Sequence, residues 1–525
     1  MSDDAATPPG QARSGDERPR TGSHRMQPPP RSARGFGSAL LLTAAGTLVP
    51  GTAFLASGRR RLGATVLLVF LVLLGAAIWL VTTGERDIVR LAVDSAALRW
   101  LIGGAVVLAL LWLVVVVTGY RSLVPRGLRG WQHAVGGLVV VLLCAAVVAP
   151  AVVVVQVANA QRDLVDSLFD DGDSATVTDQ VDQADPFGGR SEVNILLLGG
   201  DGGDGREGVR TDTVIVANVQ VDSGETTLFS LPRNLEDLPF PADSPLAAVY
   251  PDGFEAGSES ESLLNAVYRN GPAAYPDILG PTDDPGADFL KLGVGEALGL
   301  PIDYYVLVNL DGFSRLVDAL GGITVNVNYY VPVNGDMATR TLPDDYIAPG
   351  PDQEMSGVRA LDYARGRYGL TDYLRMDRQR CVLQAIVDAA DPVTLLRQYQ
   401  ELARTTKDIV STDVPSGVLG DVVDLAFSVK EAGIRSVVFD DTVIDPAYPD
   451  YPRIRELVQQ ALDPTTTGTP APTTTAPPAS TSPAAPTPAP GGNGGSATDV
   501  ADACAYDPVQ AAAALADGKP PTRND

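Results

Sequence analysis

The chain has 525 residues, and its 64 acidic residues against 39 basic ones give a formal net charge of −25. This charge argues against a nucleic-acid partner, because phosphate backbones repel acidic surfaces. The chain contains 2 histidines and 3 cysteines, and none has the spacing of metal ligands. The composition therefore excludes zinc chemistry and catalytic triads built on histidine.

The N-terminal part of the chain predicts a membrane anchor. Residues 1–34 are rich in proline, arginine, glycine and aspartate, and we expect them to form a disordered cytoplasmic tail. Three uncharged runs follow at residues 62–84, 100–120 and 134–155. At about 1.5 Å per residue, each can cross a hydrocarbon core of roughly 30 Å. We predict three transmembrane helices.

The apolar segment 35–58 decides the topology of the chain in the membrane. If it crosses, the arginines at 59–61 lie outside and the C-terminal part lies in the cytoplasm. If it is a re-entrant hairpin broken at Pro50, the arginine-rich segments all lie inside and only the charge-balanced loop 85–99 faces out. The positive-inside rule favours the hairpin, so we expect a multi-pass protein of the cell membrane with residues 160–525 outside the cytoplasm.

A hairpin carries the first candidate site residues. Short apolar runs rich in valine and isoleucine predict two strands, Val193–Leu198 and Val214–Val221, joined by a glycine-rich loop. A hairpin brings its ends together, so Asp201 and Asp212 face each other across its mouth.

A third strand, Thr226–Ser230, ends at a proline and places Arg233 near the same end of the sheet. Aspartate oxygens are hard ligands, and arginine presents a planar fork to phosphate oxygens. The cluster therefore suits a divalent cation and the phosphates that it bridges. The alternative is an acidic surface hairpin whose aspartates and glycines only make the turn.

The exported part predicts a solvated spacer at residues 161–190 and an α/β domain at residues 191–460. Residues 240–262 are polar and predict a loop. Two strands, 303–310 and 323–331, flank a helix that ends at two glycines. This β-α-β alternation around one sheet indicates an α/β sandwich.

A second cluster of candidate site residues lies between residues 356 and 390, where five arginines occur between positions 365 and 380. A short helix, Gly357–Ala364, runs into Arg365 and Arg367. The next helix begins at Asp372, and its residues Arg375 and Gln379 follow at helical spacing on one face, where they could present donors to a phosphate. The alternative is an exposed helix with ordinary ion pairs.

The C-terminal part predicts a spacer rich in proline and threonine at residues 463–495 and a short tail at 496–525. The tail carries Cys504. Since Cys144 lies in a predicted membrane helix, Cys381 and Cys504 are the exported cysteines, and we expect a disulfide between them. An unpaired tail cysteine is the alternative.

Seven motifs occur in one order, and together they resemble the LytR-CpsA-Psr family of cell-wall glycopolymer ligases over roughly residues 190–390. They are NILLLGGD, RTDT, LPRN, LNAVY, DALGGITV, G-x-x-ALDYARGR and DYLRMDRQR. The resemblance implies an extracytoplasmic α/β sandwich on a mixed sheet, with an apolar tunnel for a polyprenyl chain. It implies a Mg²⁺-dependent phosphotransferase that moves a glycopolymer, of the teichoic acid, arabinogalactan or capsule type, from polyprenyl pyrophosphate onto peptidoglycan.

The resemblance also implies roles for individual residues. Asp201 and Asp212 match the metal-site carboxylates with Arg210 as their neighbour, and the pyrophosphate clamp with its supporting residues corresponds to Arg233, Arg365, Arg367, Asp372, Arg375 and Gln379. Two positions depart from the family pattern: Asn234 replaces an aspartate, and Ser262 with Leu263 replaces a basic residue. The competing functions are a polyprenyl pyrophosphate hydrolase and a non-catalytic envelope sensor or transcription attenuator.

Overall fold

The computed structural model describes residues 35–83, 85–169, 172–177, 187–202, 209–390, 410–463 and 497–523. The predicted N-terminal tail and the spacer rich in proline and threonine lie outside these residues, apart from Asp463. The chain divides into two compact units, one of residues up to 73 with 110–148, the other of residues 74–109 with 149–525.

Among the described residues, three helices are long and apolar enough to cross a membrane: α3 (Arg60–Thr83), α5 (Ser95–Leu123) and α6 (Gly130–Leu168). The three predicted runs fall in these helices. The connection 85–99 between the first two runs contains α4 (Glu85–Val93) and the first turn of α5. The spacer expected from residue 161 begins later than predicted, because α6 continues to Leu168.

The segment 35–58 folds as two helices, α1 (Phe36–Leu48) and α2 (Thr52–Ala56). Between them Gly51 has a φ of 100°, a left-handed conformation that residues with a Cβ rarely adopt. The chain therefore breaks at Pro50–Gly51, as the hairpin hypothesis requires. Its placement in a membrane stays a prediction.

A mixed seven-stranded sheet forms the centre of the second unit, in the order β11-β10-β3-β2-β1-β4-β9. Its strands are β1 (Glu192–Gly200), β2 (Thr211–Gln220), β3 (Thr226–Leu231), β4 (Tyr304–Asn309), β9 (Val410–Thr412), β10 (Ile434–Val438) and β11 (Thr498–Asp499). The predicted hairpin is confirmed, because β1 pairs antiparallel with β2 from Glu192↔Gln220 to Gly200↔Thr211.

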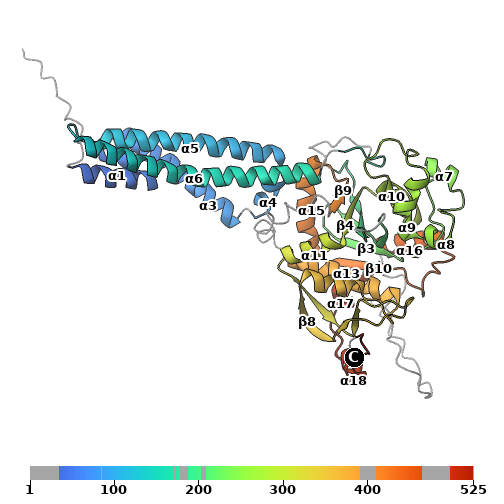
Figure 1. The fold of residues 1–525 in the computed structure, drawn as a ribbon. Helices are drawn as coiled ribbons and strands as arrows, with labels where there is room; N and C mark the ends of the chain where they lie inside the picture. The colour runs from blue at the N-terminus through green and yellow to red at the C-terminus, as the bar shows by residue number, and fades with distance from the viewer. Residues whose placement is uncertain are drawn as a thin grey trace, which may run out of the picture. The chain divides into compact units, whose positions relative to one another are not determined.

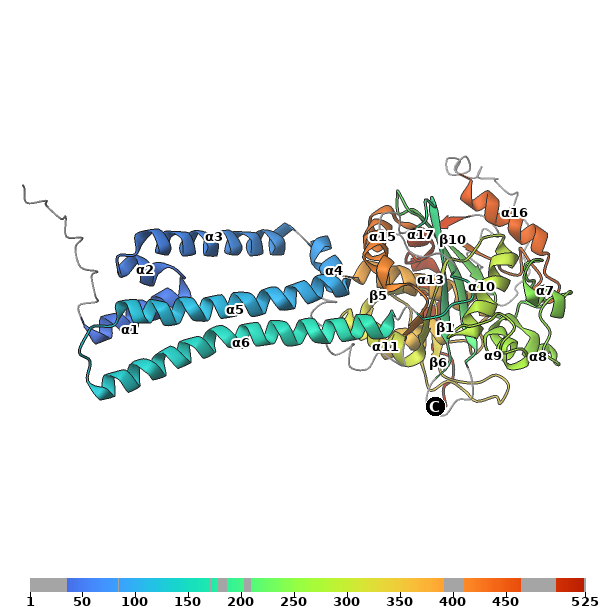
Figure 2. The same cartoon turned by 90° about the horizontal axis from the view of Figure 1, so that it is seen from above.

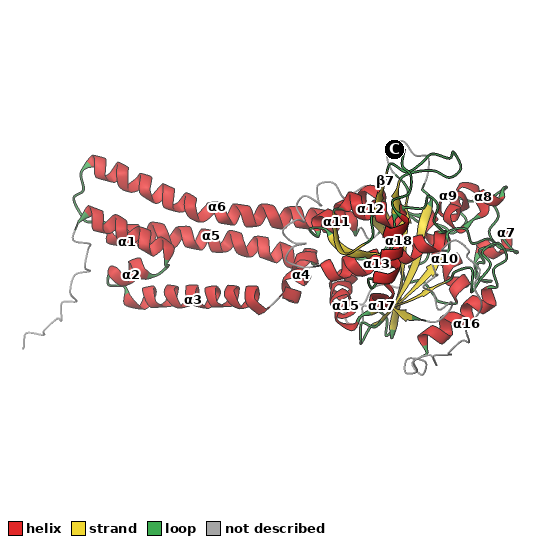
Figure 3. Cartoon of the chain, turned by 90° about the horizontal axis from the view of Figure 1, so that it is seen from below, coloured by secondary structure: helices red, strands yellow, loops and turns green. Residues whose placement is uncertain are grey.

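Helices cover both faces of this sheet (Figures 1 and 2). Inward residues such as Leu196 and Phe229 pack on one face with helices α9 (Leu264–Ala274), α10 (Pro285–Leu298) and α16 (Tyr451–Leu462). Ile215 and Leu228 point to the other face, with α13 (Asp372–Ala389) and α15 (Leu419–Ala432). The alternation along each strand thus builds a three-layer α/β sandwich (Figure 3), and the predicted fold class is confirmed.

The predicted β-α-β unit around one sheet is wrong. After β4 and α11 (Leu310–Ala319), the chain turns at Gly321 and Gly322 into β5 (Ile323–Val327), which pairs with β8 (Gly350–Met355) in a separate sheet. A third small sheet pairs β6 (Val331–Val333) with β7 (Asp345–Ile347).

The contacts around β4 and β5 explain why β5 does not join the central sheet. The free edge of β4 is taken by β9, and the apolar side chains of β5 join a second core with α12 (Gly357–Arg365) and α13. The predicted loop 240–262 is wrong in part, since it contains the short helices α7 (Pro245–Val249) and α8 (Glu259–Ser262).

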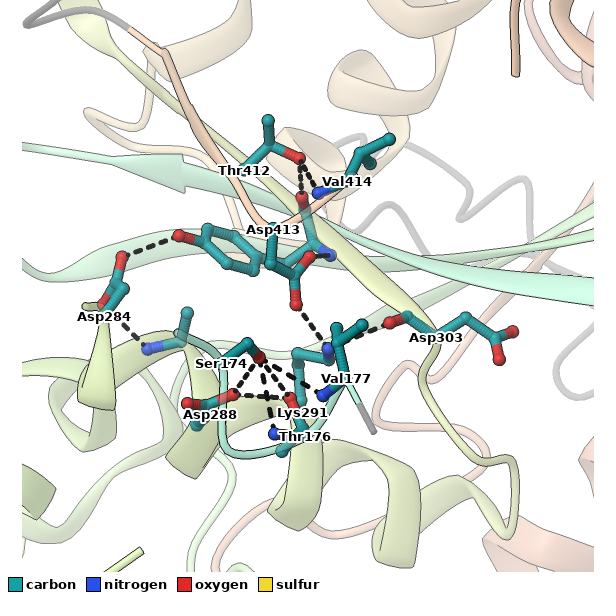
Figure 4. Close-up of polar contacts among 12 residues, drawn as sticks. Ser174, Thr176, Val177, Asp284, Asp288, Lys291, Asp303, Thr412, Asp413 and Val414 are labelled. Atoms are coloured by element: carbon teal, nitrogen blue, oxygen red, sulfur yellow. Dashed lines mark hydrogen bonds and ion pairs between the residues drawn. The ribbon is translucent and has the colours of Figure 1, made fainter. Parts of the chain in front are cut away.

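A buried polar network attaches residues 172–177 to α10 (Figure 4). Asp288 accepts hydrogen bonds from Ser174 Oγ at 3.2 Å, Ala175 N at 3.1 Å and Thr176 Oγ1. One turn later, Lys291 donates to the carboxylate of Asp413 and to a backbone oxygen. Burial raises the pKa of Asp413, against the opposing charge of Lys291. The network joins the segment that follows α6 to the core of the sandwich.

Candidate active site

A cavity of about 390 Å³ lies between the central sheet and helices α11, α12 and α13. Its apolar walls come from strands β1, β2 and β4 and from these helices, and include Leu197, Ile215, Val306, Val308, Phe313, Leu316, Leu383 and Ile386. Most of these side chains keep exposed surface although they lie between two layers of the fold. A cavity of this size and lining suits an apolar ligand.

One end of the cavity is polar. Six of the nine site residues predicted from the sequence line it: Asp201, Asp212, Arg365, Arg367, Arg375 and Gln379. Asn309 and Asn334 also reach it. The structure thus brings together the hairpin mouth and the arginines of α12 and α13, which lie more than 150 residues apart in the chain.

Asp212, near the start of β2, is held by two donors. Arg233 Nη1 donates to its Oδ1 at 2.8 Å, and Asn265 Nδ2 donates to the same oxygen at 3.2 Å. Burial pushes the pKa of Asp212 upward, but Arg233 by its charge and hydrogen bond, with Arg375 and Asn265, outweighs burial and holds the pKa below its ordinary range. Asp212 is therefore a stabilised carboxylate.

Asp372, at the start of α13, lies between two guanidinium groups. Its Oδ1 is 3.4 Å from Arg233 Nε, and its Oδ2 accepts from Arg375 Nη2 at 2.9 Å. Arg375 is 3% exposed, and burial lowers its pKa although Asp372 opposes the shift. Its Nε has no hydrogen-bond partner in the part of the chain that the structure describes. A buried N–H donor without a hydrogen-bond partner is suited to bind an anionic ligand.

Arg365 and Arg367 flank the end of α12. Gly366 between them is fixed by close packing, because a Cβ there would lie 2.4 Å from the carbonyl oxygen of Pro332. Neither guanidinium forms an ion pair with a described carboxylate, yet both line the cavity. Two positive charges are thus directed to the polar end without a neutralising partner.

The side chain of Arg210, unlike those of Arg365, Arg367 and Arg375, is not part of the cavity lining. Its backbone N–H donates to Asp201 Oδ1 at 2.8 Å, which closes the hairpin mouth and orients that carboxylate. Its side chain pairs with Glu261 Oε1 at 2.6 Å, and Glu261 also accepts from Arg269 and from Asn270 at 2.8 Å. The predicted neighbour of the carboxylates is therefore linked to them by its backbone.

Sequence reasoning missed Asn265, which binds Asp212 from α9. Its Oδ1 is buried and has no hydrogen-bond partner among the described residues. The motif LNAVY contained this residue, and an asparagine inside an apolar helix start was the available signal. Two of the five arginines are structural instead: Arg378 donates to Tyr363 O at 2.7 Å, and Arg380 donates to Ser436 Oγ at 3.0 Å.

The oxygen ligands at the polar end suit Mg²⁺ better than a metal ion that takes all of its ligands from protein side chains. Within the described residues, no three histidine, cysteine, aspartate or glutamate side chains form a metal-binding group. Asp201 and Asp212 both line the cavity, and the unpartnered Asn265 Oδ1 adds a hard oxygen beside Asp212. Magnesium is usually held by one or two carboxylates together with water and phosphate oxygens.

The chain is similar in sequence to several named proteins. The chain is 32% identical over 231 residues to the polyisoprenyl-teichoic acid–peptidoglycan teichoic acid transferase TagU of Enterococcus faecalis, over 43% of this chain and 62% of that protein. It is 25% identical over 275 residues to the corresponding transferase TagV of Bacillus subtilis, over 50% of this chain and 62% of that protein. The chain thus spans 62% of the length of each relative.

A solved structure of Bacillus subtilis TagV aligns with a TM-score of 0.34 at 24% identity, over 51% of this chain and 96% of that one. The model of the LytR_cpsA_psr family matches residues 153–448, which is more than half of the chain. The resemblance carried by the seven motifs is confirmed. This chain belongs to the LytR_cpsA_psr family.

Proposed function

We propose that the protein is a membrane-anchored phosphotransferase that moves a glycopolymer from a polyprenyl pyrophosphate carrier onto peptidoglycan as a phosphodiester. One observation carries the proposal: an apolar cavity ends at two carboxylates and three arginines, Arg365, Arg367 and Arg375. A lipid-linked pyrophosphate has the same division into a hydrocarbon chain and a charged end. The names of the relatives, which are teichoic acid transferases, support the same substrate class.

The lipid binds through burial of its hydrocarbon. Side chains such as Val306 and Ile386 keep apolar surface exposed inside the domain, and a polyprenyl chain would cover it. Each Å² of apolar surface removed from water contributes roughly 25 cal/mol. The pyrophosphate then lies among the guanidinium groups at the polar end.

The reaction breaks a phosphoanhydride bond and forms a phosphoester bond. An acceptor hydroxyl oxygen attacks the phosphorus that carries the glycopolymer, the bond from that phosphorus to the bridging oxygen breaks, and the polyprenyl phosphate leaves with the electron pair. The arginines neutralise the charge that gathers on the leaving phosphate, which is the main requirement of phosphoryl transfer.

The carboxylates have different parts in this proposal. Because its pKa is lowered, Asp212 is a poor proton acceptor, and it orders Arg233 and Asn265 instead. Asp201 also lines the cavity and is the candidate to take the proton of the attacking hydroxyl. Asp201 and Asp212 would also hold Mg²⁺, which when bound supplies positive charge to the phosphate oxygens.

The proposal requires the domain to face the cell wall. The helices α3, α5 and α6 anchor the chain, and we assign segment 35–58 to a re-entrant hairpin, which makes the protein multi-pass with its sandwich outside the cytoplasm. A reporter that works only in the cytoplasm, fused after residue 525, should be silent. Activity of this reporter would contradict the topology.

Mass spectrometry of lipid bound to the full-length protein tests the substrate class. We expect a polyprenyl phosphate or pyrophosphate to co-purify. Val306→Phe should fill the cavity and remove this lipid, whereas Val358→Phe, a matched change at a residue that is 64% exposed on α12, should retain it. Equal lipid content in both variants, or an unrelated lipid, would contradict the proposal.

A further inference from the structure

The C-terminal strap, residues 497–523, returns to the α/β sandwich and is fixed there covalently. Cys504 forms a disulfide with Cys381 on α13, the pair expected from the sequence. Beside it, β11 extends the central sheet by pairing antiparallel with β10 at Arg435↔Asp499 and Ser436↔Thr498. The anchor lies two residues after Gln379, on the helix that carries part of the site.

Beyond the disulfide the strap runs along the end of β5 and the residue that follows it. Asn326 Nδ2 donates to the carbonyl oxygen of Cys504 at 3.0 Å, and Asn328 Nδ2 donates to that of Ala505 at 3.1 Å. The backbone N–H of Asp507 returns a bond to Asn328 Oδ1 at 2.9 Å. After α18 (Pro508–Asp517), the strap therefore arrives close to the small sheet of β6 and β7.

The end of the strap binds the first residue of β7 and the two residues before it. Lys519 Nζ lies 3.0 Å from Asp345 Oδ1, and Arg523 Nη1 lies 3.2 Å from Asp344 Oδ1. The backbone N–H of Arg523 also donates to the carbonyl oxygen of Pro343 at 2.8 Å. Two ion pairs and one backbone hydrogen bond thus join the strap to positions 343–345.

Asp344 transmits these contacts to the cavity. Its Oδ2 accepts from Asn334 Nδ2 at 2.8 Å, and its N–H donates to the carbonyl oxygen of Val333 at 3.0 Å. Asn334 and Gly335 line the cavity, and both have left-handed backbones, with φ of 59° and 85°. A left-handed non-glycine residue persists only where its surroundings hold it.

We propose that the C-terminal strap is a positioning element of the substrate cavity, in which Arg523 holds the turn at Asn334–Gly335 through Asp344. Exposed ion pairs are weak alone, and the disulfide makes them intramolecular, which raises their effective concentration. The strap acts on the cavity wall through Asp344 and Asn334. Its loss therefore weakens donor binding and leaves the chemical step unchanged; this kinetic part rests on the proposed function.

Two treatments of the full-length protein in detergent test the strap. Cutting the spacer breaks the chain that leads to the strap, and reducing the disulfide then frees the strap from α13. A protease site inserted between residues 470 and 490 allows the spacer to be cut while the disulfide still holds the strap. Cutting alone should change nothing. Cutting followed by dithiothreitol should release the strap, speed hydrogen exchange at residues 331–347 and raise the KM for the lipid donor, with kcat unchanged. Unaltered exchange at 331–347 after release would overturn the proposal.

A point variant tests the same link without releasing the strap. Arg523→Ala should speed exchange at 331–347 and raise KM by about threefold, a change on the scale of one exposed ion pair. Arg523→Lys should restore both values, because it keeps a cation beside Asp344. Arg453→Ala, which removes an exposed arginine paired with Glu456 on α16, is the control and should alter neither.

Hydrogen exchange and transferase kinetics together distinguish a failure of the strap proposal from a failure of the proposed function. A wild-type protein without transferase activity would contradict the proposed function, and exchange at 331–347 would still decide whether the strap holds the turn. Accelerated exchange with an unchanged KM would overturn the positioning role.

Discussion

Arg233 donates to Asp212 Oδ1 at 2.8 Å, and its charge favours the ionised form of this cavity-lining carboxyl group. Burial alone would raise the pKa of Asp212, so the carboxylate stays ionised because of the guanidinium beside it. Arg233 also approaches Asp372, which in turn binds Arg375. The residues at the end of β3 thus connect the hairpin mouth with α13.

Arg233→Ala should raise the pKa of Asp212, because burial remains while the opposing charge is lost. The acidic limb of the pH profile of kcat/KM should then move to higher pH, and Arg233→Lys should move it less. A profile of Arg233→Ala that overlays the wild-type profile apart from a constant factor would contradict this account.

The same pair has a consequence for stability. A carboxylate with a lowered folded-state pKa stabilises the fold above its unfolded-state pKa, whose ordinary value is 3.8, and this stabilisation is lost as the pH falls through the folded-state pKa. The difference in Tm between wild type and Arg233→Ala should therefore be largest above pH 4 and should shrink on acidification. A difference that grows in acid would contradict the assigned direction.

Arg365→Ala and Arg367→Ala should each remove most transfer activity and leave the fold intact. Both side chains leave the end of α12 for the cavity, where they form no ion pair with a described carboxylate. A charge-assisted bond to phosphate contributes about 1.5 to 3 kcal/mol, so each loss should lower kcat/KM by roughly 10- to 150-fold. Arg453→Ala on the exposed face of α16 serves as control. Near-normal turnover of both cavity variants would exclude a pyrophosphate clamp.

The parts of the site that follow local patterns could be predicted from the sequence. Short apolar runs rich in valine and isoleucine predicted the hairpin that carries Asp201 and Asp212, and helical spacing placed Asp372 beside Arg375. Both depend on neighbours within a few residues or across one turn. The disulfide between Cys381 and Cys504 followed from the small number of exported cysteines.

The remaining features depend on contacts between distant segments, which no local pattern contains. The strand Ile323–Val327 leaves the central sheet because Val410–Thr412 occupies the edge of β4. Asn265 reaches Asp212 only after α9 packs on the sheet. The side chain of Arg210 pairs with Glu261 across 51 residues of sequence, so its direction could not be read from the motif RTDT.

Lys291→Met should destabilise the domain strongly. Lys291 and Asp413 are both buried, with side chains 1% and 7% exposed, and removal of the lysine leaves an unpaired carboxylate in the interior. Breaking a buried pair in this way costs about 3 to 5 kcal/mol. Chemical denaturation of the full-length protein measures the loss. Lys291→Met with Asp413→Asn should recover part of it, because asparagine is neutral and keeps an acceptor for the N–H of Tyr305. Equal stabilities of the single and double variants would show that the unpaired charge is not the cause.

The two carboxylates at the hairpin mouth, Asp201 and Asp212, both line the cavity. Asp201 and Asp212 should bind one Mg²⁺ together with the pyrophosphate and only weakly without it, because magnesium dehydrates reluctantly and two carboxylates leave its coordination incomplete. Isothermal titration of Mg²⁺ should therefore detect tight binding only when a polyprenyl pyrophosphate is present.

Asp201→Asn and Asp212→Asn should each abolish this ligand-dependent Mg²⁺ binding and the Mg²⁺ dependence of turnover. The hairpin should stay folded, because β1 and β2 remain paired along nine positions and both aspartates lie at the end next to the connecting loop. Asp222→Asn, in the turn after β2, is a matched change of charge outside the cavity and should leave Mg²⁺ binding intact. If the aspartates only shape the turn, the site variants will bind Mg²⁺ and turn over as the control does, and a metal role for this pair is then excluded.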